Sequence, residues 1–314
     1  MTFPDNLSPE LLALIARMDA EFGAVPDLTL LPATEGRART AEVNRRWNRD
    51  MPDMAVAETH VPADAGLGSA ATRLRVLTPA GAGAGTLLFV HGGGFAFCSP
   101  ETHERCGRVL ARAAGLPVWM PDYRLAPEHP FPAGLMDVIA CLRAASEQGP
   151  LVVAGDSAGA NLVLAAMLHE QVAGRPRPAG ALLFYGVYDA DFETASYRRF
   201  DAGPGLTRGK MRRYWDWYCA DAGRRRDPLA APLQAADAAL AALPPLHLMA
   251  AGIDPLLSDT LALADRLQRL GRTETVEVVP GVTHGFLQMT LDLPAARGAL
   301  ATAGAAAAAM VRQP

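Results

Sequence analysis

The apolar positions of this chain are spaced as in helices near its start and gather into short runs farther along. Ser8 and Pro9 suit the cap and first turn of a helix. Apolar residues then recur at helical spacing, at Leu11, Ile15, Met18 and Phe22. A second helix is expected to begin near Thr40, so residues 1–50 are predicted to form an N-terminal helical segment.

From about residue 56 onward, short apolar runs predict β-strands separated by helical stretches. The expected strands are 73–77, 86–90, 118–120, 151–154, 181–185, 246–250 and 275–279. Several of these runs are apolar throughout, as in strands that are buried on both faces. The alternation predicts an α/β body, residues 51–188 and 234–314, in which helices cover both faces of a mostly parallel sheet.

Residues 189–233 interrupt this alternation and are too long for a simple loop. Thr207 suits the N-cap of a helix there. Apolar and aromatic residues follow it at helical spacing, at Met211, Tyr214, Trp215 and Tyr218. We interpret the segment as an insertion that forms a cap over a pocket together with residues 1–50; ordinary packing of its helix onto the body is the alternative.

The composition of the chain argues against several classes of function. The formal net charge of -4 over 314 residues and the pI near 6.0 provide no basic surface for nucleic acid. The four cysteines show neither metal-ligand spacing nor the density of a disulfide framework. The start of the chain lacks a signal-peptide pattern, and no run approaches the ~18 apolar residues of a membrane span. A cytoplasmic protein without a membrane partner is expected.

The most informative motif is Gly155-Asp-Ser-Ala-Gly159, which lies between an apolar strand and a helix-forming stretch. A strand that turns sharply into a helix crowds the backbone, so glycine is required on both sides of the serine. The hydroxyl of Ser157 would then project above the sheet edge as a nucleophile. The alternative is a glycine-rich turn that contains an incidental serine.

A glycine triplet, Gly92 to Gly94, follows the predicted strand 86–90 directly. Successive glycines let backbone amides approach a ligand oxygen, as an oxyanion hole requires. A phosphate-binding loop is the alternative, but the lysine and the serine or threonine of the Walker pattern do not follow. The triplet therefore favours acyl transfer at Ser157.

His284 is the candidate general base because it lies in a loop just after the last predicted strand, whereas the other histidines occupy less suitable positions. In this type of fold the triad residues follow the order serine, acid, histidine. Asp254 lies between Ser157 and His284 at the end of a predicted strand, where it can orient the imidazole. Asp189 is the rival acid, and Asp259 is expected on the helix that follows.

Together these residues resemble the bacterial hormone-sensitive-lipase-like esterases of the α/β-hydrolase superfamily. The matching motifs are His91-Gly-Gly-Gly-Phe95, Asp122-Tyr-Arg-Leu-Ala-Pro-Glu128 with Pro130-Phe-Pro-Ala133, Gly155-Asp-Ser-Ala-Gly159, Asp254-Pro-Leu256 and His284-Gly-Phe286. They span residues 85–290. Two positions depart from the family pattern without touching a catalytic atom: Ala160 replaces a glycine, and Ser258 replaces a charged or polar residue.

The resemblance implies an α/β-hydrolase fold with a helical cap, and it implies roles for single residues. Ser157 would be the nucleophile, His284 the base and Asp254 the acid. The oxyanion hole would be formed by the backbone amides of Gly93, Gly94 and Ala158, with His91 and Gly92 supporting the loop. Arg124 and Glu128 are expected to form an ion-pair network near the glycine loop, while the role of Asp156 stays open.

The predicted function is that of a serine carboxylesterase. It would hydrolyse short- to medium-chain acyl or aryl esters through an acyl-enzyme, with no metal or organic cofactor. The aromatic residues expected near the pocket are Phe97, Trp215, Trp217 and Tyr218. An amidase or lactonase could use the same triad, and a non-catalytic small-molecule receptor could share the scaffold. A small-molecule ester is the expected partner, and a homodimer is left open.

Overall fold

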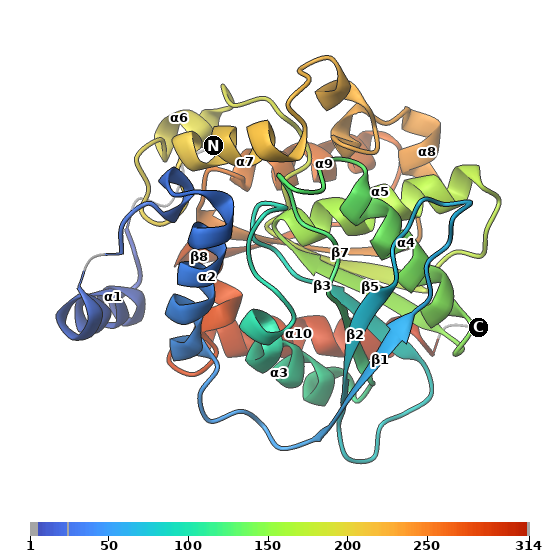
Figure 1. The fold of residues 1–314 in the computed structure, drawn as a ribbon, viewed down its shortest axis with the longest axis horizontal. Helices are drawn as coiled ribbons and strands as arrows, with labels where there is room; N and C mark the ends of the chain where they lie inside the picture. Colours follow the sequence, from blue (N-terminus) through green and yellow to red (C-terminus); the bar gives the residue numbers. More distant parts are fainter. Residues whose placement is uncertain (1–5, 24, 313–314) are drawn as a thin grey trace.

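The computed structural model describes residues 6–23 and 25–312. Its centre is an eight-stranded sheet with the order β1-β2-β4-β3-β5-β6-β7-β8. The strands are β1 (Ala55–Val61), β2 (Thr72–Thr78), β3 (Thr86–Val90), β4 (Val118–Pro121), β5 (Leu151–Asp156), β6 (Gly180–Phe184), β7 (Leu246–Ile253) and β8 (Val276–Thr283). Figure 1 shows this sheet crossing the middle of the molecule.

The sheet is mostly parallel, as the sequence predicts. Only β2 pairs in the antiparallel sense, with β1 on one side and β4 on the other. From β4 to β8 all pairs are parallel. Every residue of β3, β5 and β6 is buried, because helices cover both faces of the sheet at its centre.

Helices cover the two faces in separate groups, as Figure 1 shows. α3 and α10 pack against each other on one face, and α4, α5 and α9 cover the other. The helices are α1 (Pro9–Phe22), α2 (Ala33–Asn44), α3 (Glu104–Ala114), α4 (Ala133–Ser146), α5 (Ala158–Val172), α6 (Ala195–Arg199), α7 (Arg208–Tyr218), α8 (Asp237–Ala241), α9 (Leu257–Arg269) and α10 (Pro294–Met310). This arrangement is the α/β-hydrolase fold that the sequence predicts.

Two elements differ from the sequence prediction. β1 is absent from the predicted strands because six of its seven residues are exposed and no apolar run marks it. It exists through its pairing with β2, from Ala55 opposite Thr78 to Val61 opposite Thr72. α2 begins at Ala33 rather than near Thr40. Its sequence is polar around most of its circumference, so helical periodicity does not reveal where it starts.

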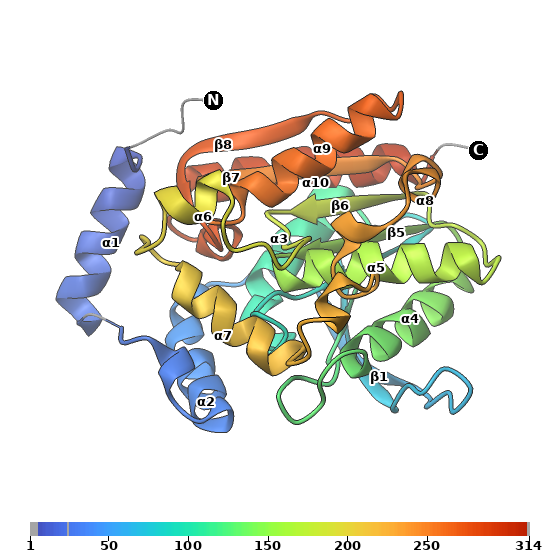
Figure 2. The same cartoon turned by 90° about the horizontal axis from the view of Figure 1, so that it is seen from above.

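The segment 189–233 runs across one end of the sheet. Figure 2 shows α6 and α7 at the end of the molecule toward which the β6 arrow points. The Thr207 side chain accepts a hydrogen bond from the Lys210 N–H and so caps α7 as expected. The buried carboxylate of Asp259 on α9 accepts the N–H groups of Tyr188 and Asp189, at 2.8 and 3.2 Å, which holds the start of the segment to the body.

Among residues 6–23 and 25–312, none of the helices combines the length and the hydropathy that crossing a bilayer would need.

α7 is joined to the body by Trp215, whose side chain is fully buried. Its ring lies 5.9 Å from that of Phe95 and 5.8 Å from that of Tyr218, measured between centroids. We expect Trp215→Ala to lower the free energy of unfolding by about 3–5 kcal/mol, since it removes a buried aromatic side chain. Denaturant unfolding measures this, with the half-buried Trp217→Ala as the matched control. Equal losses in the two variants would contradict the assignment of Trp215 as the anchor.

Candidate active site

Ser157 lies in the turn between β5 and α5, with backbone angles φ 55° and ψ -121°. Both flanking glycines are required by close contacts. A Cβ on Gly155 would lie 2.4 Å from the backbone of Gly159, and a Cβ on Gly159 would lie 2.0 Å from the carbonyl oxygen of Val90. The turn therefore has the crowded geometry that the sequence predicts, and it places the serine at the N-terminus of α5.

His284 and Asp254 extend from this serine in a line of hydrogen bonds. The Nε2 atom of His284 is 2.9 Å from Ser157 Oγ, and its Nδ1 atom is 2.7 Å from Asp254 Oδ2. Asp254 is fully buried at the end of β7, and its other oxygen accepts the N–H of Leu256 at 2.8 Å. With Nδ1–H donating to the carboxylate, Nε2 is free to accept the serine proton.

The two other aspartates considered as the acid lie elsewhere. Asp189 accepts hydrogen bonds from Ala190 N–H and from the Gln234 amide. Asp259 lies on α9 and holds the backbone after β6. Burial raises the pKa of Asp259 well above its usual value, as expected for a carboxyl with a structural position in the interior. The structure thus brings only Asp254 of these three to His284.

The glycine loop after β3 points backbone amides toward the serine. Gly93 and Gly94 adopt φ values of 115° and 59°, which glycine tolerates best. Within the described part of the chain, neither donates its N–H to a protein acceptor. Ala158 is the first residue of α5, where amides have no partner inside the helix. These three N–H groups are available to a ligand oxygen beside Ser157.

A buried network of polar side chains connects the glycine loop to the turn that holds Ser157. Its central residue is Asp156, for which the sequence predicted no role. Asp156 Oδ1 accepts the N–H of Gly92 at 2.8 Å and lies 3.4 Å from His103 Nε2. The hydroxyl of Tyr185 lies 3.4 Å from the other carboxylate oxygen. Burial alone would raise the pKa of Asp156, but the charge and hydrogen bond of His103, together with the N–H of Gly92, hold it below its usual value. Asp156 therefore remains an ionised acceptor.

His91 fixes the other side of the glycine loop. Its ring stacks on Tyr123 with 4.4 Å between centroids, and its Nδ1–H donates to the Gly92 carbonyl at 2.8 Å. The Tyr123 hydroxyl donates to the His91 carbonyl at 2.8 Å. Burial, with the charge of His103 adding to it, lowers the pKa of His91 to about 4. A neutral imidazole packed in this way suits a supporting position rather than a proton-transfer role.

The pocket above Ser157 has a volume of about 150 Å³. Its walls come from the body and from the segments outside it: Asn44, Gly93, Gly94, Cys98, His103, Asp156, Ser157, Leu206, Met211, Tyr214, His284, Gly285 and Gln288. Tyr214 lies so close to Gly94 that a Cβ there would be 2.2 Å from the ring. Asn44 on α2 and Met211 on α7 thus line the pocket. Trp215 belongs to the core, and none of the four aromatic residues expected at the pocket lines it: Phe97, Trp215, Trp217 and Tyr218.

Cys98 is the other side chain of this pocket that could act as a nucleophile. Burial raises the pKa of its thiol to about 12, so the reactive thiolate is scarce at neutral pH. Ser157, which has a base within hydrogen-bond distance, is the better placed of the two.

Arg124 and Glu128, which were expected to form an ion-pair network, each form an ion pair, but with separate partners. Arg124 pairs with the buried Asp137 on α4 at 2.8 Å. Glu128 pairs with Arg37 on α2, also at 2.8 Å. The two side chains therefore bind different elements, and Glu128 joins the N-terminal segment to the body.

Comparison with known proteins shows the family to which the chain belongs. A family model described as alpha/beta hydrolase fold matches residues 87–288. An acetyl-hydrolase of Streptomyces hygroscopicus is 36% identical over 225 residues, which cover 70% of this chain and 74% of that protein. The chain belongs to the hormone-sensitive-lipase-like family of α/β hydrolases. As a member of this family, it is an ester hydrolase.

Solved structures of family esterases resemble the whole chain. An ester-hydrolase from the metagenome of Lake Arreo, complexed with a derivative of bipyridine phosphonate, is 36% identical, with a TM-score of 0.87 over 96% of this chain and 98% of that one. A thermostable esterase from Pseudomonas putida is 29% identical, with a TM-score of 0.91 over 100% of both chains. An esterase from Pyrobaculum calidifontis is 27% identical, with a TM-score of 0.88 over 97% of this chain and 99% of that one.

The Asp156 network generates a prediction. Replacing Asp156 with alanine leaves the Gly92 N–H without its acceptor, and a charge-assisted hydrogen bond of this kind contributes about 1.5–3 kcal/mol. We expect kcat for p-nitrophenyl acetate to fall by about 10- to 100-fold because the glycine loop shifts from the nucleophile, with a smaller change in KM. Asp156→Asn retains an acceptor oxygen and should recover part of kcat.

The control is Asp122→Asn, which weakens an outlying ion pair with Arg73. Thermal unfolding of each variant shows whether the fold is intact. A folded Asp156→Ala variant with unchanged kcat would contradict this positioning role.

Proposed function

We propose that this ester hydrolase cleaves short- to medium-chain acyl or aryl esters by a serine mechanism. Ser157 attacks the acyl carbonyl while His284 Nε2 takes the hydroxyl proton. Asp254 holds the imidazole through Nδ1–H and stabilises its charged form. The observation that carries the proposal is the line of hydrogen bonds of 2.9 and 2.7 Å through the two nitrogens of His284.

In the proposed reaction, the tetrahedral oxyanion is held by the N–H groups of Gly93, Gly94 and Ala158. Collapse of this intermediate breaks the bond to the alcohol, which leaves with the proton from His284. The result is an acyl group esterified to Ser157. Water then attacks this ester, with His284 again removing the proton, and the carboxylic acid leaves as Ser157 regains its hydrogen.

Pocket size supports the proposed substrate range. A volume of about 150 Å³ beside Ser157 suits a small acyl group. The walls from α2 and α7 support the proposal that residues 1–50 and 189–233 form a cap over the site. Among similar proteins, the Streptomyces hygroscopicus relative is an acetyl-hydrolase, and one solved esterase mutant is complexed with (S)-Ac-CPA. These names support a small acyl group as substrate here.

The test is hydrolysis of p-nitrophenyl esters from acetyl to palmitoyl. We expect kcat/KM to peak at short chains and to fall steeply toward palmitoyl, which the pocket volume does not admit. In Ser157→Ala turnover should drop by at least about 10⁴-fold, since the serine acts as a unit with its base. Ser146→Ala should keep full activity, since the Ser146 hydroxyl donates to the Leu142 carbonyl on α4, away from the site.

Two results would overturn the proposal. Activity that persists in Ser157→Ala would place the nucleophile elsewhere. No ester turnover by the folded, unaltered protein would favour an amidase, a lactonase or a small-molecule receptor instead.

A further inference from the structure

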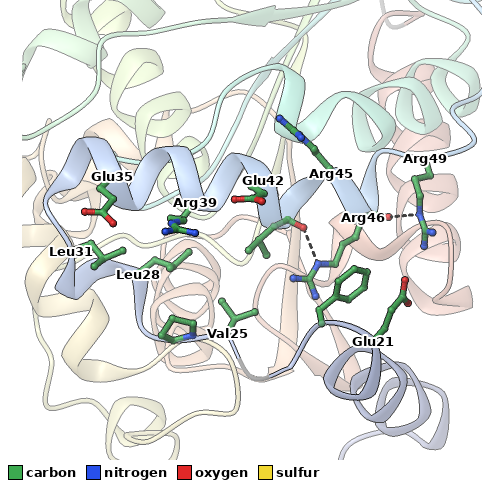
Figure 3. Close-up of a pocket in the computed structure, with 13 residues that line it drawn as sticks. Glu21, Val25, Leu28, Leu31, Glu35, Arg39, Glu42, Arg45, Arg46 and Arg49 are labelled. Carbon is green, nitrogen blue, oxygen red and sulfur yellow. Dashed lines mark hydrogen bonds between the residues drawn. The ribbon is translucent and has the colours of Figure 1, made fainter.

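A second and larger pocket, of about 860 Å³, lies between α1 and α2. Figure 3 shows the side chains around it, with α2 along one side and the end of α1 on the other. None of the described residues lines both this pocket and the pocket above Ser157. Arg37 and Asn44 on α2 face the body, whereas Glu35, Arg39 and Glu42 on the same helix face this second pocket. The two pockets therefore lie on different faces of α2.

One part of the α1–α2 pocket is apolar. Phe22 and Val25 line it and are 50% and 45% exposed. Leu28 and Leu31 continue the apolar wall toward the start of α2, and Figure 3 shows them beside Val25. This surface offers contact to a hydrocarbon group, whose transfer from water contributes about 0.8 kcal/mol per buried CH₂.

The charged residues of the pocket fall into two groups. Six of the seven are exposed to solvent: Glu21, Glu35, Arg39, Glu42, Arg45 and Arg49. The seventh, Arg46, is only 9% exposed. A buried arginine normally pairs with a carboxylate, because the guanidinium stays charged at all ordinary pH values. Arg46 is thus the exceptional charged group of this pocket.

Arg46 has no ion-pair partner among the residues that the structure describes. Its Nε–H donates to the Val43 carbonyl at 2.8 Å. The guanidinium carbon lies 4.8 Å from the Phe22 ring centroid and 5.8 Å from that of Trp47. Burial lowers the pKa of Arg46, and the charge of Glu21 only partly opposes this effect. Among the residues that the structure describes, its two terminal nitrogens, which carry four N–H donors, have no hydrogen-bond partner and are available to a ligand.

We infer that the α1–α2 pocket binds a small amphipathic carboxylate. Its head would accept the paired N–H groups of Arg46, and its hydrocarbon tail would lie along Phe22, Val25, Leu28 and Leu31. Planar carboxylates match the fork of a guanidinium, and the rings of Phe22 and Trp47 pack beside the guanidinium of Arg46. The six exposed charged residues are three carboxylates and three guanidiniums, which balance, so Arg46 supplies the net positive charge of the pocket.

Octanoate is the probe, titrated into the intact chain by isothermal calorimetry. Octanol and octylammonium have the same tail with a neutral or positive head, and acetate has the head without the tail. We expect octanoate to bind at least about tenfold more tightly than each of these, since it alone satisfies both parts of the pocket. Equal binding of octanol and octanoate would overturn the assignment of Arg46 as the head site.

Substitutions at two positions test the location. Arg46→Met should weaken octanoate binding by about tenfold or more, with Arg46→Lys retaining part of the affinity. Because Arg46 packs on two rings, its loss could also loosen the fold, so Val25→Asp provides an independent test on an exposed residue. It places a negative charge beside the tail and should weaken binding similarly.

Val172→Asp is the matched control, since this residue of α5 is 88% exposed and does not line the pocket. Octanoate affinity that is unchanged in both folded Arg46→Met and Val25→Asp would place the ligand elsewhere and overturn the inference. Absence of octanoate binding to the unaltered chain would also overturn the inference. Arg46 would then be a structural cation that packs against two aromatic rings.

Discussion

The site depends first on the parallel pairing of β3 with β5. Because Val90 pairs with Gly155, the chain leaves both strands at the same sheet edge, and the glycine loop and the nucleophile turn meet there. The glycine loop and the turn at Ser157 are so close that no side chain fits on Gly159 or Gly92. A Cβ on Gly159 would meet the Val90 carbonyl, and one on Gly92 would lie 2.7 Å from Asp156. The amides and the serine hydroxyl are therefore positioned by the same packed backbone.

Much of this arrangement could be predicted from the sequence, since it follows from local patterns. Strands that are buried on both faces have sequences that are apolar throughout, and a serine between glycines after such a strand predicts the sharp turn. His284 and Asp254 follow later strands whose ends meet at the same edge. Parallel strands make residues that are distant in the chain neighbours in space, so the order of motifs indicated Ser157 and His284. The rival acids Asp254 and Asp189 both fit that order, and the structure separates them.

Other features could not be predicted, because they depend on partners distant in sequence or on polar surfaces. β1 and the start of α2 are exposed and lack apolar periodicity. Asp156 has its position because Gly92 and His103 come from a different strand and loop, which the motif itself does not reveal. Likewise, nothing near Arg46 in the sequence indicates that it is buried beside the α1–α2 pocket without a carboxylate partner among the described residues.

The central claim is that Ser157 is activated by His284 in an already assembled triad. The most direct measurement is mass spectrometry of the intact chain after reaction with a p-nitrophenyl phosphonate ester, followed by peptide mapping. We expect one phosphonyl adduct per chain, on Ser157, and a much slower formation of this adduct in His284→Ala. An adduct on another residue such as Cys98, or an unchanged rate of labelling without His284, would contradict it.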